Sequence, residues 1–540
     1  MMLYRNNLEE GTKVSAAAKG LVATRREFLQ FVAAQAAGTA LACGALSAED
    51  DPRRLSKGAE VDPAKPNILF LMTDQHRADC LGCDGNHVIK TPNLDRIARE
   101  GVRFTQAYSS TPTCTPARAA LLTGLSPWRH GMLAYGRVAR AYGFEKPRAM
   151  SDAGYHTFAI GKLHYHPQRN YHGYAGALID ESGRVQSEGF VSDYRQWFRS
   201  KAPDLDPDAT GIGWNDYRAG AYALPEELHP TRWTGDRAVE FISTYQRREP
   251  FFLKVSFARP HSPYDPPRRF LEMYGEADMP APHVGDWARG FDGRGDPSNY
   301  TLWRGDLGVD QARRSRRGYY GSVSFIDEQI GRVLKALEQR GLLEGALILM
   351  TSDHGDMLGD HHFWRKSYAY AGSARIPMLL RWPRNWGMHE RRGSALDQPV
   401  ELRDVLPTFL DAAGAPAKDG LDGASLLKLV RGESGWRPHI DLEHGACYSK
   451  ENHWNAFTDG KWKYIYHAFD GSQQLFDLVN DPHELHDLSS DRGCARTLKY
   501  WRRRMVRHLQ ERGDGWVRDG DLAPRPETML YSPNYPHSAG

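Results

Sequence analysis

The stretch P-T-C-T-P-A-R-A-A-L-L-T-G, residues 112–124, has the pattern of a turn that leads into a helix. Thr115 is a suitable N-cap, and Pro116 suits the first helical position. Cys114 is therefore predicted at a helix N-terminus, where unpaired backbone N–H groups and the helix dipole favour an anion and lower the pKa of a thiol. Arg118 is predicted in the first turn, where a cation is best tolerated if it holds an anion. A small buried cysteine beside a surface arginine fits the same residues, so the flanking sequence decides between the two interpretations.

Four apolar runs end in side chains that bind metals or transfer protons. They are Asn67–Thr73 before Asp74 and Gln75, His156–Gly161 before Lys162 and His164, Phe251–Ala258 before Arg259 and His261, and Ala346–Ser352 before Asp353 and His354. Continuous apolar runs of this length are typical of strands buried on both faces of a parallel sheet. A polar residue often stands where one strand meets solvent, but four endings of this composition indicate a shared site. Such sites form at the carboxyl ends of the strands in an open α/β sheet.

The first and last of these runs supply ligands for a hard divalent cation. Asp74, Gln75, Asp353 and His354 provide two carboxylates, an amide oxygen and an imidazole. Mainly oxygen ligands favour Ca²⁺, Mg²⁺ or Mn²⁺, and the imidazole also suits Mn²⁺ or a softer metal. Either pair alone fits an aspartate that caps a loop, so the predicted metal site depends on the two pairs lying together.

Cations and further imidazoles complete the predicted site. Arg118, Lys162 and Lys366 are candidate clamps for an anion. His164 and His261 are candidate proton carriers, because imidazole is the usual acid–base group near neutral pH. A metal ion, positive side chains and a helix N-terminus together define a pocket for an oxyanion ester such as a sulfate or a phosphate.

The N-terminus has the pattern of an export signal. Arg25 and Arg26 precede a mildly apolar, alanine-rich run from Phe28 to Leu46. Residues 1–48 therefore resemble a twin-arginine-type signal peptide, although an amphipathic N-terminal helix also fits. The pattern predicts a bacterial protein that is periplasmic or secreted, with no transmembrane span in its mature form.

The rest of the chain is expected to form an α/β protein with a smaller C-terminal part. The predicted divisions are a linker at 49–65, a catalytic domain at 66–434, a C-terminal α+β subdomain with an antiparallel sheet at 435–517, and a Pro-rich, loosely held tail at 518–540. Further predictions are helices at 318–340, 402–413 and 495–512, hairpin turns at 459–460 and 470–471, and irregular insertions over the site at 165–235 and 263–315. A formal charge of +3 is too small to indicate a nucleic-acid partner. Cys447 and Cys494 could pair, but nothing in the sequence requires it.

Five motifs, in this order, resemble those of the type I sulfatases. They are N-I-L-F-L-M-T-D-Q at 67–75, P-T-C-T-P-A-R-A-A-L-L-T-G at 112–124, G-Y-H-T-F-A-I-G-K-L-H at 154–164, P-H-S-P-Y at 260–264 and S-D-H-G-D at 352–356. Two later segments, W-K-Y-I-Y and L-F-D-L-V-N-D-P-H-E-L, resemble the C-terminal region of the same family. The resemblance spans residues 66–490. It implies an alkaline-phosphatase-like fold, in which helices flank a large, mixed and mostly parallel sheet.

The resemblance also implies a sulfuric ester hydrolase and a role for each matching residue. A formylglycine-generating enzyme would convert Cys114 to formylglycine, whose hydrated aldehyde attacks sulfur and later expels sulfate as the aldehyde re-forms. The predicted metal ligands, together with residue 114, would hold one divalent cation, typically Ca²⁺ in this family. Arg118 and Lys162 would contact the nucleophile and the sulfate. His164 would help to deprotonate the second hydroxyl. His261, which is the expected general acid, and Lys366 would face the leaving oxygen.

Gln75 and His354 depart from many arylsulfatases, which have Asp and Asn at the matching positions. The combination of Asp74-Gln75 with Asp353-His354 also resembles choline sulfatases and phosphonate monoester hydrolases. Three hypotheses follow. The first is an exported sulfatase acting on sulfated carbohydrate, with a sulfated small molecule or glycan as its substrate. The second is a phosphonate monoester or phosphodiester hydrolase on the same scaffold, and the third is a non-catalytic glycan-binding relative. Every position that can be matched is filled, which argues against the third. The residues expected to contact substrate, each of which also fits a structural role, are Arg259, Tyr264, Asp265, His166 and His444.

Overall fold

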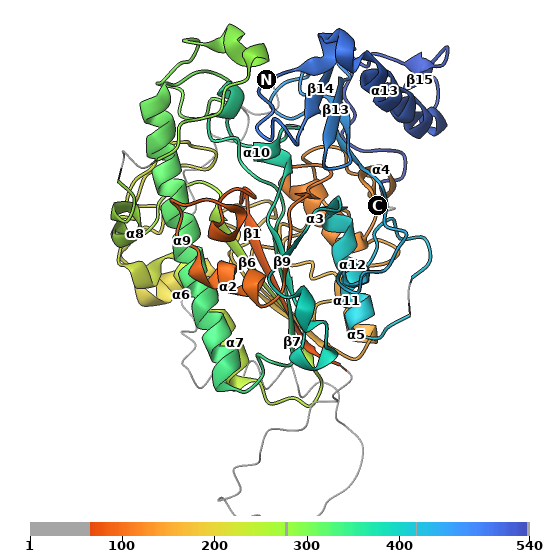
Figure 1. Cartoon of the computed structure of the whole chain (residues 1–540). Coiled ribbons are helices and arrows are strands. Elements are labelled where there is room, and N and C mark those ends of the chain that lie inside the picture. The colour runs from red at the N-terminus through yellow and green to blue at the C-terminus, as the bar shows by residue number, and fades with distance from the viewer. Residues whose placement is uncertain (1–64, 276–278, 417, 537–540) are drawn as a thin grey trace, which may run out of the picture. The chain divides into compact units, whose positions relative to one another are not determined.

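An eight-stranded mixed sheet forms the core of the computed structural model, which describes residues 65–275, 279–416 and 418–536. Its strand order is β5-β4-β6-β1-β7-β8-β2-β9 (Figure 1). The strands are β1 (Asn67–Asp74), β2 (Val102–Phe104), β4 (His156–Gly161), β5 (Gly176–Ile179), β6 (Phe251–Pro260), β7 (Ala346–Ser352), β8 (Met378–Arg381) and β9 (Ser394–Leu396). The predicted signal peptide at 1–48 and nearly all of the predicted linker at 49–65 lie outside the described residues.

The four predicted strands are neighbours in this sheet and run parallel. β4 pairs with β6, β6 with β1, and β1 with β7, so that Ile68 lies opposite Phe252 on one side and Leu347 on the other. Every residue of β1, β6 and β7 is buried, as expected for strands covered on both faces. The prediction of four parallel strands is confirmed, and their carboxyl ends lie along one edge of the sheet.

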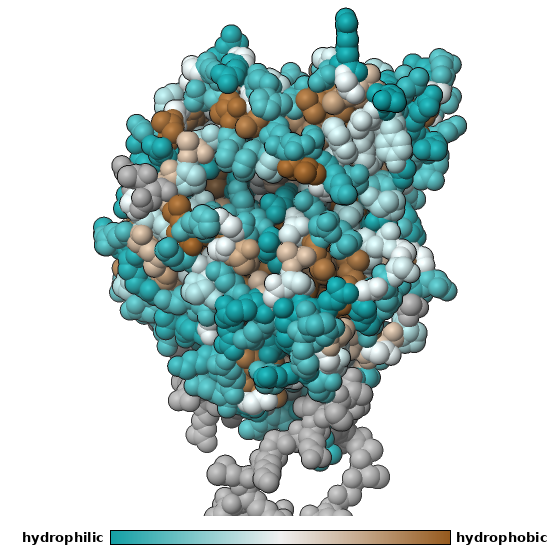
Figure 2. Space-filling view, viewed as in Figure 1, coloured by the Kyte–Doolittle hydropathy of each residue, from teal (hydrophilic) through white to brown (hydrophobic). Residues whose placement is uncertain are grey.

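Helices cover both faces of the sheet. One face carries α3 (Cys114–Thr123), α5 (Lys146–Asp152), α11 (Val405–Ala412) and α12 (Leu426–Val430), and the other carries α2 (Pro92–Arg99), α7 (Pro230–Thr244) and α9 (Val309–Gln339) (Figure 1). Successive residues of β1 point to opposite faces, so Phe70 packs on Phe409 of α11 while Leu71 joins the cluster that contains Ile330 of α9. Each such side chain contributes about 1.5–3 kcal/mol relative to an exposed position. Hydrophilic side chains dominate the face of the molecule shown in Figure 2.

α3 begins earlier than predicted. Thr113 has the extended backbone of an N-cap, with φ −147° and ψ 142°, and Cys114 is the first helical residue. The prediction of Thr115 as N-cap is therefore wrong. Pro116 is tolerated inside the first turn because the first N–H groups of a helix have no acceptor within it. Arg118 consequently lies in the second turn, whereas Cys114 keeps its predicted place at the helix N-terminus.

The predicted insertions contain more secondary structure than expected. Residues 165–235 include β5 and α6 (Asp193–Lys201), and residues 263–315 include α8 (Arg268–Glu272) and the start of α9. The side chain of Ser192 accepts a hydrogen bond from the N–H of Arg195, which fixes the start of α6. α9 begins at Val309, before the predicted start at residue 318. The prediction missed its first turns because they are rich in arginine and lack the apolar spacing on which it depended.

A four-stranded antiparallel sheet and helix α13 (Ala495–Leu509) form the C-terminal part, blue in Figure 1. The strands, in spatial order, are β11 (Ile440–His444), β12 (Trp454–Thr458), β13 (Trp462–His467) and β14 (Gln473–Asp477). The predicted turns at 459–460 and 470–471 join β12 to β13 and β13 to β14, so both hairpins are confirmed. Trp501 and Met505 of α13 pack on this sheet.

The C-terminal tail is attached to the body of the protein, which corrects the expectation of a loosely held segment. Tyr531 forms a β-bridge with Met132. The phenol of Tyr535 donates a hydrogen bond to the carbonyl of Arg137 at 2.8 Å. These contacts hold the tail, up to residue 536, against the segment that follows α3.

Cys447 and Cys494 carry free thiols, so the pairing that the sequence allowed does not form. The thiols of Cys80, Cys83 and Cys114 are also free. Within the described residues, no helix combines the length and the apolar character needed to cross a membrane.

Candidate active site

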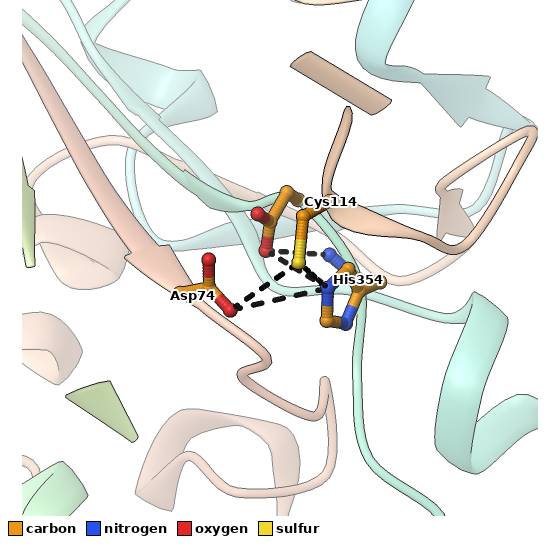
Figure 3. A group of neighbouring side chains, drawn as sticks. Asp74, Cys114 and His354 are labelled. Carbon is orange, nitrogen blue, oxygen red and sulfur yellow. Dashed lines mark hydrogen bonds and ion pairs between the residues drawn. The ribbon is translucent and has the colours of Figure 1, made fainter. Parts of the chain in front are cut away.

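Asp74, Cys114, Asp353 and His354 converge at the carboxyl ends of β1 and β7. Asp74 is the last residue of β1, Asp353 and His354 follow β7, and Cys114 begins α3. One ligand atom from each lies within 4.8 Å of those from the others, and all four residues are buried. Figure 3 shows the sulfur of Cys114 between Asp74 and the imidazole of His354. Two carboxylates and an imidazole at this spacing fit a divalent cation.

Hydrogen bonds fix the amide of Gln75 at both ends. Its Nε2 donates to Asp356 Oδ2 at 2.6 Å, and its Oε1 accepts from Lys366 Nζ at 2.8 Å. The backbone N–H of Gln75 donates to Asp353 Oδ1 at 3.1 Å, which places the residue beside the metal-ligand cluster. Asp356, the last residue of the motif S-D-H-G-D, was not a predicted site residue, but in the structure it orients Gln75.

Arg118 and Lys162 pair with the two buried carboxylates. Arg118 donates to Asp353 Oδ2 and Asp74 Oδ2, both at 3.0 Å, and Lys162 Nζ lies 2.5 Å from Asp74 Oδ2. Burial raises the pKa of Asp74, but the charges of Lys162 and Arg118 outweigh burial and hold that pKa well below its usual range. Asp74 is thus ionised, and both carboxylates have cationic partners within the site itself.

The thiol of Cys114 faces His354. Cys114 Sγ lies 3.1 Å from His354 Nε2 and 3.9 Å from Asp74 Oδ1. Burial and Asp74 raise the pKa of the thiol, whereas Lys366, Lys162 and His354 lower it, and the net result is a pKa of about 7. The helix N-terminus alone predicted a lowered pKa; the structure adds the neighbouring cations as a cause.

His261 accepts hydrogen bonds from two cations. Lys366 Nζ lies 2.8 Å and Arg184 Nη2 lies 3.3 Å from His261 Nε2. Because lysine and arginine only donate, Nε2 carries no proton, and Nδ1–H donates to the carbonyl of Ser262 at 2.9 Å. Burial and then Lys366 hold the pKa of His261 well below its usual value. The geometry therefore favours Lys366 over the predicted His261 as the proton donor to a leaving group.

The turn after β4 holds His164 beside Lys162. His164 has a left-handed backbone with φ 59°, and its N–H donates to Glu181 Oε1 at 2.7 Å, as does the N–H of Leu163 at 3.0 Å. Burial and Lys162 lower the pKa of His164 well below its usual value, so the imidazole is neutral. Glu181 was not predicted, because a single glutamate in a polar loop belongs to no motif.

Arg259 and Asp265, two of the residues predicted to contact substrate, form a buried ion pair. Their Nε and Oδ1 atoms are 2.9 Å apart, and both residues line a cavity of about 300 Å³. His166 is half-buried on the loop after β4. Of the five predicted contacts, the structure thus brings Arg259 and Asp265 to a cavity.

Tyr264 and His444 support the site from inside the protein. The phenol of Tyr264 is buried and donates to Asp356 Oδ2 at 2.5 Å, which completes the contacts that hold Gln75. His444 Nε2 lies 3.0 Å from the hydroxyl of Thr113, the N-cap of α3. Both positions correct the expectation of a substrate-facing side chain, because burial directs each polar atom to a partner within the protein.

Comparison with known proteins places this geometry in a family. A family model described as Sulfatase matches residues 66–415. The chain belongs to the sulfatase family. A second family model, described as N-sulphoglucosamine sulphohydrolase, C-terminal, matches residues 359–511 of this sulfatase. The resemblance predicted from the five motifs is confirmed.

Two related sequences and one solved structure illustrate the proteins to which this sulfatase is similar. An arylsulfatase of Clostridium perfringens (strain 13 / Type A) is 37 % identical to this sulfatase over 471 residues, which cover 85 % of this chain and 97 % of that protein. An N-acetylglucosamine-6-O-sulfatase of Bacteroides thetaiotaomicron is 26 % identical over 535 residues, which cover 86 % and 89 %. A solved structure, the phosphonate monoester hydrolase of Agrobacterium radiobacter, has a TM-score of 0.70 at 24 % identity and covers 86 % of this chain and 100 % of its own. The sulfatase is thus a sulfuric ester hydrolase with an alkaline-phosphatase-like fold.

Proposed function

We propose that this sulfatase hydrolyses sulfate monoesters of carbohydrates, with a formylglycine at position 114 and one divalent cation. The observation that carries the proposal is the convergence of Cys114, the carboxylates of Asp74 and Asp353, and the cations of Arg118 and Lys162 at one edge of the sheet. The N-acetylglucosamine-6-O-sulfatase among its relatives supports a sulfated sugar as the substrate.

A hydrated aldehyde is a nucleophile that the enzyme can regenerate. One hydroxyl of the hydrate would lose its proton to solvent and attack sulfur while the S–O bond to the alcohol breaks, so the sulfate would become esterified to residue 114. The second hydroxyl then loses its proton, the carbonyl re-forms, and the C–O bond to sulfate breaks; water then adds to the aldehyde and restores the hydrate. A thiol has no second oxygen and cannot expel sulfate in this way. We assign the neutral imidazole of His164 as the base for the second hydroxyl.

Asp74, Gln75, residue 114, Asp353 and His354 would hold the divalent cation, with Ca²⁺ as the expected ion and Mg²⁺ or Mn²⁺ as alternatives. When bound, the cation supplies positive charge that favours an ionised hydroxyl at residue 114 and the oxygens of a sulfate. The two carboxylates are already neutralised by the arginine and lysine beside them. The site therefore has a net affinity for an anionic ester.

Protonation of the leaving oxygen falls to Lys366. Its ammonium group donates to His261 Nε2 and to Gln75 Oε1, both at 2.8 Å, and these two acceptors orient it. The third N–H of the ammonium group is the proton that we assign to the departing alcohol. His261 acts in this scheme as a positioning residue for Lys366.

Hydrolysis of phosphonate monoesters or phosphodiesters is the second candidate, because a phosphonate monoester hydrolase shares the fold. The test compares kcat/KM of the purified, formylglycine-containing protein on 4-nitrophenyl sulfate and on 4-nitrophenyl phenylphosphonate. We expect the sulfate ester to be the better substrate. A clear preference for the phosphonate would overturn our choice, and turnover of neither ester nor of any sulfated sugar would support a non-catalytic glycan-binding role.

We also propose export to the periplasm or beyond through the twin-arginine machinery, after formylglycine formation and folding. Arg25 and Arg26 carry this proposal. Replacing both by lysine is expected to keep the protein in the cytoplasm, which fractionation and immunoblotting would detect. An unchanged amount in the periplasm would contradict the proposed route.

A further inference from the structure

A cavity of about 300 Å³ lies beside the catalytic groups, and no step of the proposed reaction uses it. The loop that follows β5, the segment 207–214 and the end of β6 form its walls. β5 pairs with β4, so Asp180 ends on the same edge of the sheet as Lys162, and its N–H donates to the carbonyl of Gly161 at 3.2 Å. The cavity is therefore a neighbour of the proposed sulfate site, and its volume is at the lower end of the range for ligand pockets.

Arg184 and Trp214 connect this cavity to His261. Arg184 Nη2 lies 3.3 Å from His261 Nε2, and its guanidinium lies 4.0 Å from the centre of the Trp214 ring. Trp214 lines the cavity and is held by a 2.8 Å hydrogen bond from its Nε1 to the carbonyl of Ser182. Pro263, which closely follows His261 in the chain, lines the cavity too. Arg184 thus bridges Trp214 in the cavity wall and His261 in the catalytic site.

Three buried polar atoms in the cavity wall have no hydrogen-bond partner among the residues that the structure describes. They are Asp180 Oδ2, Ser182 Oγ and Arg195 Nε. The side chain of Asp180 is buried, and its Oδ1 accepts the N–H of Ser182 at 2.9 Å, so Oδ2 is the unpaired oxygen of this carboxylate among the described residues. Buried polar atoms are costly to leave unpaired, so a ligand that pairs with these three is favoured.

The charges of the cavity narrow the chemistry of that ligand. Arg259 pairs with Asp265, and Arg195 pairs with Asp208, with N–O distances of 2.9 Å and 2.7 Å. Asp180 adds a negative charge, which disfavours a second sulfate group. A quaternary ammonium group would match the charge, but it has no N–H or O–H and would leave the three polar atoms unpaired. Hydroxyl groups donate and accept, so they suit all three.

We propose that this cavity binds the hydroxylated ring of the alcohol half of the substrate, with Asp180 accepting hydrogen bonds from ring hydroxyls. Trp214 and Tyr222 line the same cavity and supply flat faces for the apolar side of such a ring. The inference rests on the proposed sulfatase function and assigns the selection of a sugar to the end of β5 and the segment 207–214.

The test measures kcat/KM of wild type and Asp180→Asn on monosulfated hexoses and N-acetylhexosamines, on choline sulfate and on 4-nitrophenyl sulfate. Asparagine keeps the shape of the side chain but removes the charge. We expect the ratio of kcat/KM on the preferred sulfated sugar to that on 4-nitrophenyl sulfate to fall roughly tenfold to hundredfold, the usual loss for a hydrogen bond to a charged group. Asp204→Asn is the matched control, because Asp204 is exposed and lies outside the cavity. Its ratio is expected to stay within about twofold of wild type.

An unchanged ratio for Asp180→Asn, or an equal loss on both classes of substrate, would overturn the inference. A wild-type preference for choline sulfate, or turnover of 4-nitrophenyl sulfate without turnover of any sulfated sugar, would overturn it as well while leaving the sulfatase proposal in place. Lack of turnover of every sulfate ester would contradict the proposed function instead. Thermal unfolding reports whether Asp180→Asn folds. If it does not, Ser182→Ala removes a second cavity atom, and the same ratio is expected to fall.

Discussion

Replacing Arg118 by methionine removes the shared counter-ion of two buried carboxylates. Arg118 donates to Asp74 and Asp353 at 3.0 Å each and to the carbonyl of Lys162 at 2.9 Å, and its side chain is only 1 % exposed. Removing one partner of a buried ion pair costs about 3–5 kcal/mol, because the other charge stays buried. Lys162 still pairs with Asp74, so Asp353 bears most of the loss. We therefore expect the free energy of unfolding in EDTA to fall by about 3 kcal/mol.

Urea unfolding in EDTA and in saturating Ca²⁺ measures this effect. Ca²⁺ should restore more stability to Arg118→Met than to wild type, because the bound cation replaces the missing positive charge. Turnover of 4-nitrophenyl sulfate should fall at least about 100-fold. Arg129→Met is the matched control, since its pair with Asp422 is partly exposed and contributes about 0–1 kcal/mol. If Arg118→Met and wild type unfold at the same urea concentration in EDTA, the counter-ion role of Arg118 is wrong.

Three further predictions follow from the charges of the protein. Lys366→Met should lower kcat/KM for sulfated alcohols by about 10²–10⁴, but less for 4-nitrophenyl sulfate, whose leaving group needs little protonation; an equal loss on both would exclude Lys366 as the proton donor. EDTA should abolish turnover yet leave the far-UV circular dichroism unchanged, because Arg118 and Lys162 neutralise the metal-ligand carboxylates, and global unfolding in EDTA would contradict this. Burial lowers the pKa of Lys146 from its ordinary value of 10.5 to about 7. The charged form of Lys146 therefore reduces the free energy of unfolding by its full amount below about pH 7, and this loss of stability disappears as the pH rises towards 10.5. Lys146→Met should therefore raise the thermal midpoint strongly at pH 6 and little at pH 10, and a pH-independent difference would refute the buried-charge explanation.

Hydrophobic runs predicted the central sheet well, because β1, β6 and β7 are buried along their whole length and leave an unbroken apolar signal. β5, by contrast, has only the residues G-A-L-I and lies in a polar insertion, so its sequence could not be told from a loop. The N-cap of α3 was misplaced because Thr113 and Thr115 suit that position equally well in local sequence. Backbone geometry, with Thr113 extended, decides between them.

Asp74, Lys162 and Asp353 were predictable because each follows a strand that the sequence marks, and Arg118 because it lies in the helix predicted from Cys114. The ion pairs and hydrogen bonds between these residues were not predictable, since they depend on contacts between segments that are distant in the sequence. His261 was expected to be the general acid, yet Lys366 and Arg184, which come from other loops, both donate to its Nε2 and leave it without a proton there. Glu181 and Arg184 stand in a loop whose sequence resembles any polar turn, so only the structure places them.

The central claim is that residue 114 acts as a formylglycine and not as a cysteine. Mass spectrometry of the tryptic peptide 104–118 from active protein tests it most directly, combined with the specific activity of each preparation. We predict a peptide in which an aldehyde or its hydrate replaces the thiol, in a fraction that rises in proportion to specific activity, and a folded but inactive Cys114→Ala variant. Fully active protein that contains only cysteine at position 114 would contradict the account.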